Sequence, residues 1–400
     1  MSAARLGDRS LFRALEPRAY LNHAGVSPPS DPVREAVRDA VDGYARLGGA
    51  AVAAALERRE RLRGRLAELV GARPGDIALT QNTSAGVQAV ALCLPWRRGE
   101  RVVLFEGEFP ANVTPWQRAA DLFGLEIRFV PLAAFYRSAE EGLALVRGEL
   151  ARGVRLLAVS AVQFRGGLRM PLRELAEMCA AAGAEIFVDA VQAAGVVPLD
   201  VRGVDYVAAG AHKWLMGLQG AGFLYVRPER AAALVPRTAG WLSHEDPVRF
   251  LLEPGQLRYD RPVRRRADFV ESGGASEVSL AALLASLDIL LSLGVPAILG
   301  HVTRYLDLLE PELAARGFRS LRAREPERRS GILSVEPPPG VPVADLAREV
   351  RARGVACATP DGALRFAPHW PNEVEEIPLV LEAVDGAVGA VRGRAGTAGP

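Results

Sequence analysis

The sequence almost lacks lysine. Of its 49 lysine and arginine residues, 48 are arginines and one is a lysine, Lys213. A coding bias that writes arginine wherever a positive charge suffices explains the missing lysines, but it does not explain the one that is present. A guanidinium stays protonated in a protein, whereas an amine can lose its proton and act as a nucleophile. Lys213 therefore predicts a site that requires a neutral amine, and a Schiff base is the leading chemistry of that kind.

Cysteine is also scarce. The three cysteines, Cys93, Cys179 and Cys357, are odd in number and far apart, so they give no metal-ligand spacing and suit a reducing compartment. Residues 1–20 carry charges throughout and lack the apolar segment of a signal peptide. We therefore expect a cytoplasmic protein without a bound metal.

A long hydrophobic run and an excess of charge are both missing. The longest apolar stretch, residues 279–300, is interrupted by Asp288 and contains Pro296, which favours a buried helix over a membrane span. The formal net charge of +2 gives no electrostatic case for nucleic acid or an anionic membrane as a partner. The basic run at residues 258–266 has acidic neighbours, and we interpret it as a solvated or subunit-facing loop.

The chain does contain a regular alternation of secondary-structure patterns. Its 400 residues, 49% of them hydrophobic, can bury a large core and divide into two lobes. Between residues 76 and 226, strand patterns alternate with amphipathic helical ones, which is typical of an α/β sheet covered on both faces. The predicted strands are 77–80, 101–105, 126–130, 156–160, 185–188, 206–209 and 222–226, and the predicted helices are 85–94, 114–123, 140–152 and 172–182.

The pattern changes near residue 290. A helix is predicted at 296–316, followed by short strands at 331–336, 354–358 and 364–367 and by more helix, which indicates a smaller α+β domain. We assign residues 20–289 to a large α/β domain. Residues 1–19, as an N-terminal arm, and residues 290–392 form the small domain, and residues 393–400 form a flexible tail.

Polar residues cluster where the predicted strands end, and there open α/β sheets bind their ligands. Asp189 closes an apolar strand, Gln192 follows three residues later, and His212 and Lys213 follow the next strand. This order and spacing suggest a pyridoxal 5′-phosphate (PLP) site. Such a site needs a lysine for the cofactor aldehyde and a carboxylate against the pyridinium nitrogen, so that the ring stabilises a carbanion at the substrate Cα. Gln192 can then donate to the ring's phenolic oxygen and His212 can reach the phosphate.

Six segments extend this pattern along the chain. They are Val-Asp-Ala-Val-Gln-Ala at 188–193, Gly-Ala-His-Lys at 210–213, Tyr-Leu-Asn-His-Ala-Gly at 20–25, Thr-Gln-Asn-Thr-Ser at 80–84, Glu-Phe-Pro-Ala-Asn at 108–112 and Arg-Phe-Ala-Pro-His-Trp-Pro-Asn at 365–372. Together, over residues 20–385, they resemble the class V aminotransferase family of PLP enzymes. That family includes cysteine desulfurases, selenocysteine lyases, kynureninase, an isopenicillin epimerase and true aminotransferases.

The resemblance implies a fold, a cofactor and a set of site residues. The fold is the PLP-dependent transferase fold type I, with a mostly parallel seven-stranded sheet, in a homodimer that acts on an amino acid. Lys213 is the implied catalytic residue, which forms the internal aldimine and then removes the Cα proton. The implied cofactor-binding residues are Thr83, Ser84, Phe109, Asp189, Gln192, His212, Lys213 and Gly274, and the implied substrate-binding residues are Arg365, Asn22 and His23.

Some of these residues also have a plainer interpretation. Thr83 and Ser84 suit the N-terminal cap of a helix beginning near residue 85, which is compatible with phosphate binding at the same helix end. Phe109 would by default be a core residue and Arg365 a surface charge, but their motifs favour ring stacking and a bidentate clamp for the substrate carboxylate. His23 suits a substrate pocket and structural hydrogen bonding equally well.

The sequence departs from the family at positions that bear on the reaction. Cys357 lies in a predicted strand, whereas desulfurases carry a nucleophilic cysteine on a loop, and Phe109 stands where they have a histidine. Both changes argue against persulfide chemistry, because phenylalanine cannot move a proton. Phe164 falls where desulfurases have an asparagine near the ring, and Gln163 is its candidate substitute.

Two further departures concern the phosphate. Gly210 and Gly274 stand where the family commonly has a serine and a partner-subunit threonine, so backbone N–H groups, Ser84 and His212 would carry the phosphate. These glycines weigh slightly toward a non-catalytic PLP-fold binding protein. We predict an aminotransferase, with a Cβ-lyase of the desulfurase or selenocysteine lyase type and an amino-acid epimerase as alternatives.

Overall fold

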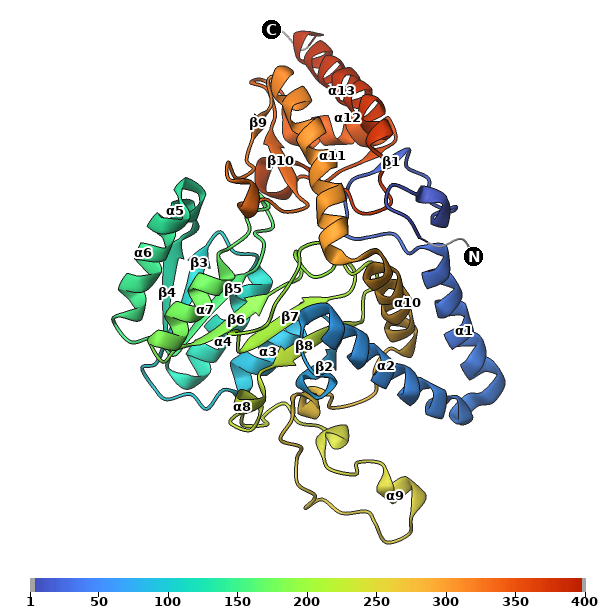
Figure 1. Ribbon diagram of the computed structural model, residues 1–400, viewed down its shortest axis with the longest axis vertical. Helices are drawn as coiled ribbons and strands as arrows, with labels where there is room; N and C mark the ends of the chain where they lie inside the picture. Colours follow the sequence, from blue (N-terminus) through green and yellow to red (C-terminus); the bar gives the residue numbers. More distant parts are fainter. Residues whose placement is uncertain (1–3, 398–400) are drawn as a thin grey trace.

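A seven-stranded sheet forms the centre of the protein, whose computed structural model describes residues 4–397 (Figure 1). The strand order is β2-β8-β7-β6-β5-β3-β4. The strands are β2 (Ile77–Thr80), β3 (Arg101–Glu106), β4 (Glu126–Pro131), β5 (Leu156–Ser160), β6 (Glu185–Asp189), β7 (Tyr206–Gly210) and β8 (Gly222–Val226). Neighbours are parallel except β8, which is antiparallel to both β2 and β7. This arrangement confirms the predicted α/β fold with a mostly parallel sheet.

Helices cover both faces of this sheet because successive strand residues point to opposite sides. Val103 and Phe105 of β3 belong to one hydrophobic cluster, whereas Val102 and Leu104 belong to a second cluster. The helices of the first cluster include α2 (Val52–Val70), α6 (Ala139–Leu150), α7 (Leu172–Ala181) and α10 (Glu277–Leu293), and those of the second include α3 (Thr83–Cys93) and α4 (Thr114–Phe123). Strands buried on both faces explain the near-continuous apolar runs in the sequence.

The parallel register brings the carboxyl ends of three strands to one edge. Ser160 at the end of β5 pairs with Asp189 at the end of β6, and Asp189 pairs with Ala208 of β7. Lys213 follows three residues after the end of β7. Residues that are far apart in the sequence therefore start from neighbouring positions.

The small domain contains an antiparallel three-stranded sheet in the order β12-β10-β9. Its elements are α11 (Val295–Ala315), β9 (Arg319–Ser320), β10 (Leu333–Glu336), α12 (Val343–Ala352), β11 (Val355–Ala356), β12 (Leu364–Phe366) and α13 (Ile377–Thr397). The N-terminal arm joins this domain because β1 (Ala19–Tyr20) pairs in parallel with β11. Residues 393–397 of the predicted tail continue α13, and residues 398–400 lie outside the described residues.

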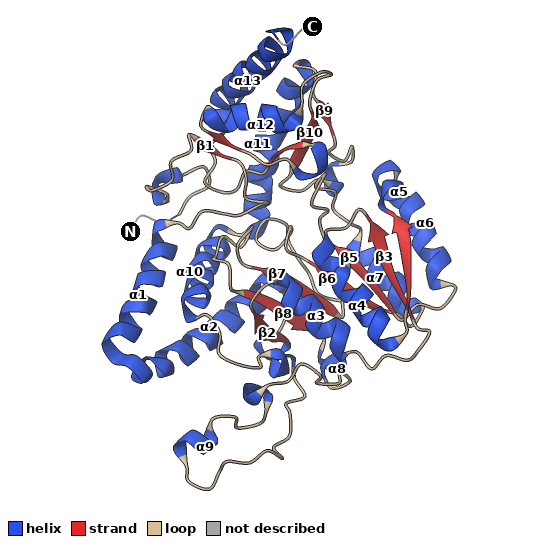
Figure 2. Ribbon diagram, turned by 180° about the vertical axis from the view of Figure 1, so that it is seen from behind, coloured by secondary structure: helices blue, strands red, loops and turns tan. Residues whose placement is uncertain are grey.

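Two regions project from the body, as Figures 1 and 2 show from opposite sides. One is the pair α1 (Asp31–Leu47) and α2. The other is the long loop of residues 236–276, which follows the short helix α8 (Pro228–Ala231) and contains the short helix α9 (Arg249–Leu252). Both carry exposed apolar side chains, among them Leu47 and Tyr259. The basic run lies in this loop, where Arg258 pairs with Asp260 and Arg264 pairs with Asp268.

Helix α5 (Leu132–Arg137) follows β4 directly and completes the large domain. Across residues 4–397, no single helix is long and apolar enough to cross a membrane. The bent pair α10 and α11, with an angle of 79° between them, meets the length and composition criteria only when the two are taken together. Most residues of α10 are buried in the protein core.

Candidate active site

Lys213 lies in the turn that follows β7, with its side chain half-buried. Its Nζ is 5.3 Å from the centre of the Phe109 ring. Burial lowers the pKa of Lys213 to about 8, with Asp189 raising this pKa and Arg365 lowering it. The backbone oxygen of Lys213 accepts a hydrogen bond of 2.7 Å from Ser27 Oγ, which anchors the turn to the N-terminal segment. A substantial fraction of this amine is therefore neutral near pH 8, as a nucleophile or base requires.

Asp189 supplies a buried carboxylate at the end of β6, with 2% of its surface exposed. Burial raises its pKa to about 7. Its Oδ1 accepts a hydrogen bond of 2.9 Å from the N–H of Val191, which holds the carboxylate in place. A cation placed against this carboxylate would stabilise its ionised form.

Gln192 is buried and its amide is largely used by the protein. Its Nε2 donates to the backbone oxygen of Ala24 over 3.0 Å, and its Oε1 accepts from Trp214 Nε1 over 2.7 Å. One N–H of the amide has no protein acceptor in these contacts, and the predicted hydrogen bond to the cofactor would use that remaining hydrogen.

The N-terminus of α3 faces the end of β7. The helix is capped by Asn82, whose Oδ1 accepts a hydrogen bond of 2.9 Å from the N–H of Ala85. Thr83 is instead buried, and its Oγ1 accepts from the N–H of Gly210 over 2.9 Å. Ser84 is half-buried, and its hydroxyl has no hydrogen-bond partner among the described residues. The capping function therefore belongs to Asn82, which leaves Ser84 and the first-turn N–H groups at the helix end.

Gly210 lies in a narrow space between α3 and His212. A Cβ at this position would lie 3.2 Å from Thr83 Oγ1 and 3.4 Å from His212 Nδ1. The glycine thus brings the strand close to α3. Burial lowers the pKa of His212, and the charge on Lys213 lowers it further, so this ring is neutral at pH 7.

The predicted substrate-binding residues lie in β12 and in the N-terminal segment. Arg365 of β12 is 6% exposed, and its Nη1 donates to the backbone oxygen of Phe164 over 2.9 Å. Its Nε is buried without a partner, and so is Asn22 Oδ1. Burial lowers the pKa of Arg365 to about 10, which leaves it charged at neutral pH. An unpaired guanidinium nitrogen is a ready donor for a substrate carboxylate.

His23 takes part in a buried hydrogen-bond chain. Its Nδ1 lies 2.7 Å from Ser27 Oγ, and its ring makes an edge contact with His369 at 5.3 Å between centroids. Burial, with a further contribution from His369, holds the pKa of His23 well below its usual value. These contacts support the structural interpretation of His23. Through Ser27, the ring is linked to the backbone of Lys213.

Gly274 lies apart from this cluster, in the exposed segment that precedes α10. It lines a cavity of about 300 Å³ together with Thr80, Gln81 and Arg59. A Cβ at position 274 would meet no atom within 4 Å. In a single chain, therefore, Gly274 lies near Thr80 and Gln81, which precede α3, and its side is open.

Sequence reasoning did not single out Glu108 as a site residue. This carboxylate is 8% exposed, and it accepts hydrogen bonds from the N–H and Oγ of Ser160 and from Gln163 Nε2. Burial raises its pKa. Its neighbour Phe109 packs edge-on against Phe164, with 5.3 Å between ring centroids. The signal in the sequence was a glutamate directly before the stacking phenylalanine.

A model of the class-V aminotransferase family matches residues 19–364, which span most of the chain and every predicted site residue except Arg365, the residue directly after the match. The chain belongs to the class-V aminotransferase family. Within residues 4–397, no group of three or more His, Cys, Asp or Glu side chains is placed to hold a metal ion.

Three related sequences show the range of this family. An uncharacterized aminotransferase, YcbU of Bacillus subtilis, is 28% identical over 94% of this chain and 96% of its own length. Isopenicillin N epimerase of Streptomyces clavuligerus is 30% identical over 81% of this chain and 83% of its own. A probable cysteine desulfurase of Methanothermobacter thermautotrophicus is 27% identical over 94% and 96%.

Solved structures confirm that this class-V family member has fold type I. An apo cysteine desulfurase from Thermococcus onnurineus NA1 superposes with a TM-score of 0.84 at 23% identity, covering 98% of this chain and 100% of that one. The cystine C–S lyase C-DES, in complex with cysteine persulfide, gives a TM-score of 0.84 at 23% identity, covering 94% and 99%. A C-DES variant with glycine covalently linked to its PLP cofactor gives 0.84 at 24%, covering 95% and 99%.

Pyridoxal 5′-phosphate is the cofactor of this class-V enzyme, as the sequence predicted. The residues present fit that group. The α3 N-terminus and Ser84 offer donors for a phosphate, Asp189 offers a buried acceptor for a protonated ring nitrogen, and Lys213 offers an amine of lowered pKa. Phe109 is 43% exposed beside Lys213, so its ring has a free face on which a planar cofactor can stack.

Proposed function

We propose that this PLP enzyme is an aminotransferase that acts on an α-amino acid. Bound PLP supplies an electron sink that stabilises negative charge at the substrate Cα. The observation that carries the proposal is the position of Lys213, whose Nζ lies beside Phe109 with a pKa near 8. The aromatic pair Phe109 and Phe164 next to it has no proton to exchange. Lys213 is then the residue that would take the proton from the substrate Cα and hold it on Nζ for the transfer that transamination requires.

The other residues of the proposed site position the reactants. Asp189 holds the ring nitrogen protonated, Phe109 stacks on the ring, and Arg365 binds the substrate carboxylate. Ser84 and His212 contact the phosphate at the α3 N-terminus. Thr83 fixes the distance between α3 and β7 through Gly210 and so acts behind these contacts.

The cysteines argue against desulfurase chemistry. Cys93, Cys179 and Cys357 are all buried and free of disulfides. Cys357 follows β11, is 4% exposed, and has its pKa raised to about 12 by burial. A thiol that stays protonated and inaccessible cannot attack sulfur on a bound substrate. The three free thiols also support our proposal of a reducing, cytoplasmic environment.

Epimerisation is the second candidate, because isopenicillin N epimerase is 30% identical over 81% of the chain. Both reactions begin with removal of the Cα proton, and they differ in where that proton returns. Inversion at Cα is helped by a second acid or base on the opposite face, whereas transamination needs one base only, and the products decide between them. The apolar pair Phe109 and Phe164 favours transamination because it offers no second base.

The deciding experiment incubates the PLP-loaded enzyme with a panel of amino acids. Transamination converts the cofactor to pyridoxamine phosphate and yields one equivalent of 2-oxo acid. Release of ammonia or sulfide with the cofactor unchanged would instead identify a lyase. Inversion at Cα, with deuterium incorporation from D2O and no oxo acid, would identify an epimerase.

We also propose that the enzyme is a homodimer. The projecting α1–α2 pair and the loop of residues 236–276 carry exposed apolar side chains, including Leu252 and Tyr259, which are 80% and 89% exposed. Apolar surface of this kind is typical of an interface. Gly274 lies in the same loop as Tyr259, so a partner docked there would come close to the end of α3 that is proposed to bind the phosphate. Size-exclusion chromatography with light scattering measures the mass of the protein in solution. A monomer at all micromolar concentrations tested would contradict this proposal.

A further inference from the structure

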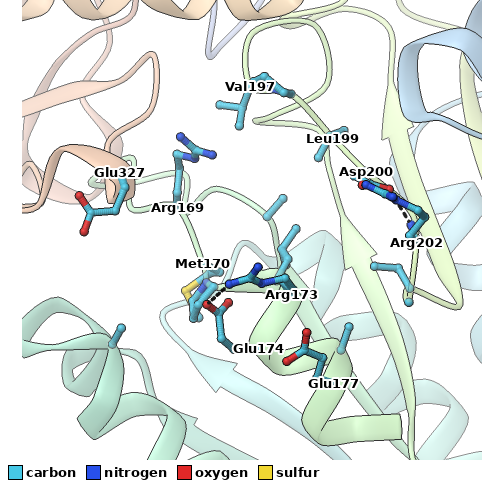
Figure 3. Close-up of a pocket in the computed structure, with 18 of the residues that line it drawn as sticks. Arg169, Met170, Arg173, Glu174, Glu177, Val197, Leu199, Asp200, Arg202 and Glu327 are labelled. Atoms are coloured by element: carbon cyan, nitrogen blue, oxygen red, sulfur yellow. Dashed lines mark hydrogen bonds and ion pairs between the residues drawn. The ribbon is translucent and has the colours of Figure 1, made fainter.

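A cavity of about 870 Å³ lies outside the cofactor site, between the large domain and the small domain (Figure 3). It is lined by α7 and the segment before it, by residues 197–204 between β6 and β7, and by Glu327 and Arg328 of the small domain. We call it the α7 cavity. Its volume falls in the range of about 300–1,000 Å³ that is typical of small-molecule sites. None of the residues assigned above to the cofactor or the substrate lines it.

Most arginines of the α7 cavity are already neutralised. Arg202 pairs with Asp200 at 2.5 Å, Arg227 pairs with Asp205 at 3.2 Å, and Arg328 pairs with Glu325 at 3.4 Å. The side chain of Arg173 has Glu174 as a neighbour at 3.7 Å.

Arg169 differs from these arginines. Among the described residues its side chain has no ion pair and no hydrogen bond, and Figure 3 shows it without a dashed line. It is half-buried at the cavity wall, and burial lowers its pKa. A guanidinium that is partly removed from water and left unpaired is a strong candidate to bind an anion.

The other residues that line the cavity limit the kind of anion that can bind there. Glu177 and Glu327 also line the cavity without a partner in the described part of the chain, so the surroundings of Arg169 disfavour a multiply charged group such as phosphate. The rest of the wall is largely apolar and includes Met170, Leu172, Val197 and Leu199. We propose that the α7 cavity binds a small organic monocarboxylate, with its carboxylate on Arg169 and its apolar body against this wall.

The cavity is connected to the substrate side of the active site by one hairpin. Arg169 and Val162 face each other in an antiparallel bridge at the base of this hairpin. On the strand that leaves Val162, Gln163 donates to Glu108, and the backbone oxygen of Phe164 accepts from Arg365. A ligand held by Arg169 therefore contacts the hairpin that positions Arg365, and, if Arg365 is the proposed carboxylate clamp, we expect its binding to change the affinity for the amino acid.

The test uses 4-bromobenzoate as the carboxylate probe and the PLP-loaded enzyme as the target. Calorimetry is done in an Arg365→Gln background, which removes carboxylate binding at the substrate clamp. Adding Arg169→Gln is expected to weaken the remaining binding by about 10-fold or more. Adding Arg202→Gln, which alters a paired arginine of the same cavity, is expected to leave it within about 2-fold.

Crystals soaked in the probe locate it independently. The bromine gives an anomalous peak, which we expect in contact with the apolar wall around Met170 and Leu172. Equal affinity in the Arg169→Gln and Arg202→Gln variants, or bromine found elsewhere only, would overturn the proposal. Since the Arg169 side chain has no protein partner, Arg169→Gln is expected to fold normally, as its melting temperature and cofactor absorbance will show.

A separate kinetic experiment tests whether binding in the α7 cavity affects Arg365. With Arg365 intact, the probe is expected to change the KM for the amino acid more in the wild type than in Arg169→Gln. Equal changes in the two proteins would contradict the connection, because both retain any direct competition at Arg365. This comparison does not depend on which amino-acid reaction the enzyme catalyses.

Discussion

The carboxylate of Glu108 accepts a hydrogen bond of 2.7 Å from the backbone N–H of Ser160, at the point where β5 ends. Ser160 in turn pairs in register with Asp189. Glu108 thus joins the end of β5, next to Asp189, to the loop that carries Phe109. Because it also binds Gln163, it fixes the hairpin that contacts Arg365. One buried charge connects the proposed ring, stacking and substrate contacts.

Glu108→Gln is therefore expected to reduce stability and turnover together. The glutamine keeps the size of the side chain but cannot accept from all three donors, so the free energy of unfolding should fall by about 1–3 kcal/mol. The charge on Glu108 raises the pKa of Asp189, so its removal should also shift the pH profile of activity to lower pH. Denaturant unfolding and pH–rate profiles measure the two effects. The matched control is Glu106→Gln at the exposed end of β3, which should change stability by less than about 0.5 kcal/mol.

Lys213→Ala should abolish covalent attachment of the cofactor, because the chain contains no other side-chain amine. Borohydride reduction of the PLP-loaded wild type should add one cofactor mass per chain, located on the peptide that contains Lys213. The variant should gain none. A reduced adduct that survives in the variant would contradict the role of this lysine.

The pH dependence of Lys213 in the cofactor-free protein follows from its environment. Its pKa near 8 means that the neutral amine rises with pH and reaches about half near pH 8, whereas an ordinary lysine is still almost fully charged there. The rate of acetylation of Lys213, read by peptide mass spectrometry, should show this midpoint. Arg365→Gln should move the midpoint up and Asp189→Asn should move it down. Shifts in the same direction would refute the electrostatic account.

Arg365→Gln should weaken the enzyme selectively toward substrates that carry a carboxylate. A charge-assisted hydrogen bond contributes about 1.5–3 kcal/mol, so the KM should rise by about 10- to 100-fold. The corresponding amines, which lack the carboxylate, should be affected much less. Arg319→Gln is the matched control, because Arg319 lies in β9 of the same small-domain sheet but is exposed.

Cys357→Ala should leave turnover unchanged. The thiol is buried next to β11 and protonated, so its loss creates a small cavity that costs about 1 kcal/mol of stability without touching the reaction. Steady-state assays with the substrate found in the amino-acid panel, alongside thermal unfolding, check this. Loss of a sulfur-releasing activity in this variant would reverse the argument against desulfurase chemistry.

The sequence predicted the sheet well because its strands, apart from the largely exposed edge strand β4, are buried on both faces. All seven strands of the large sheet were predicted to within one residue at either end, and α4 was predicted at residues 114–123. The predicted start of α3, residue 85, was two residues late because Thr83 and Ser84 suited an N-terminal cap. The cap is Asn82, and only the contact between Thr83 and Gly210 shows why Thr83 is not free for that function.

Residues whose function depends on burial were harder to find. Glu108 follows a strand and precedes a loop, where a glutamate is normally solvated, and nothing local shows that three donors surround it. His23 was left between two interpretations because Ser27, which binds its ring, is contacted only in the folded chain. Arg169 was one arginine among 48, and its missing partner became visible only with the cavity wall around it.

The pairing of β1 with β11 also orders events during synthesis. Residues 19–20 leave the ribosome long before their partner strand at residues 355–356. The same holds for Asn22, which forms a bridge with Ala367. The large domain can fold while the chain is still growing, but the N-terminal arm must wait, unpaired, for the C-terminal part. A nascent chain that ends before residue 355 therefore lacks both contacts of the N-terminal arm, and Asn22 reaches its place only after that part of the chain is made.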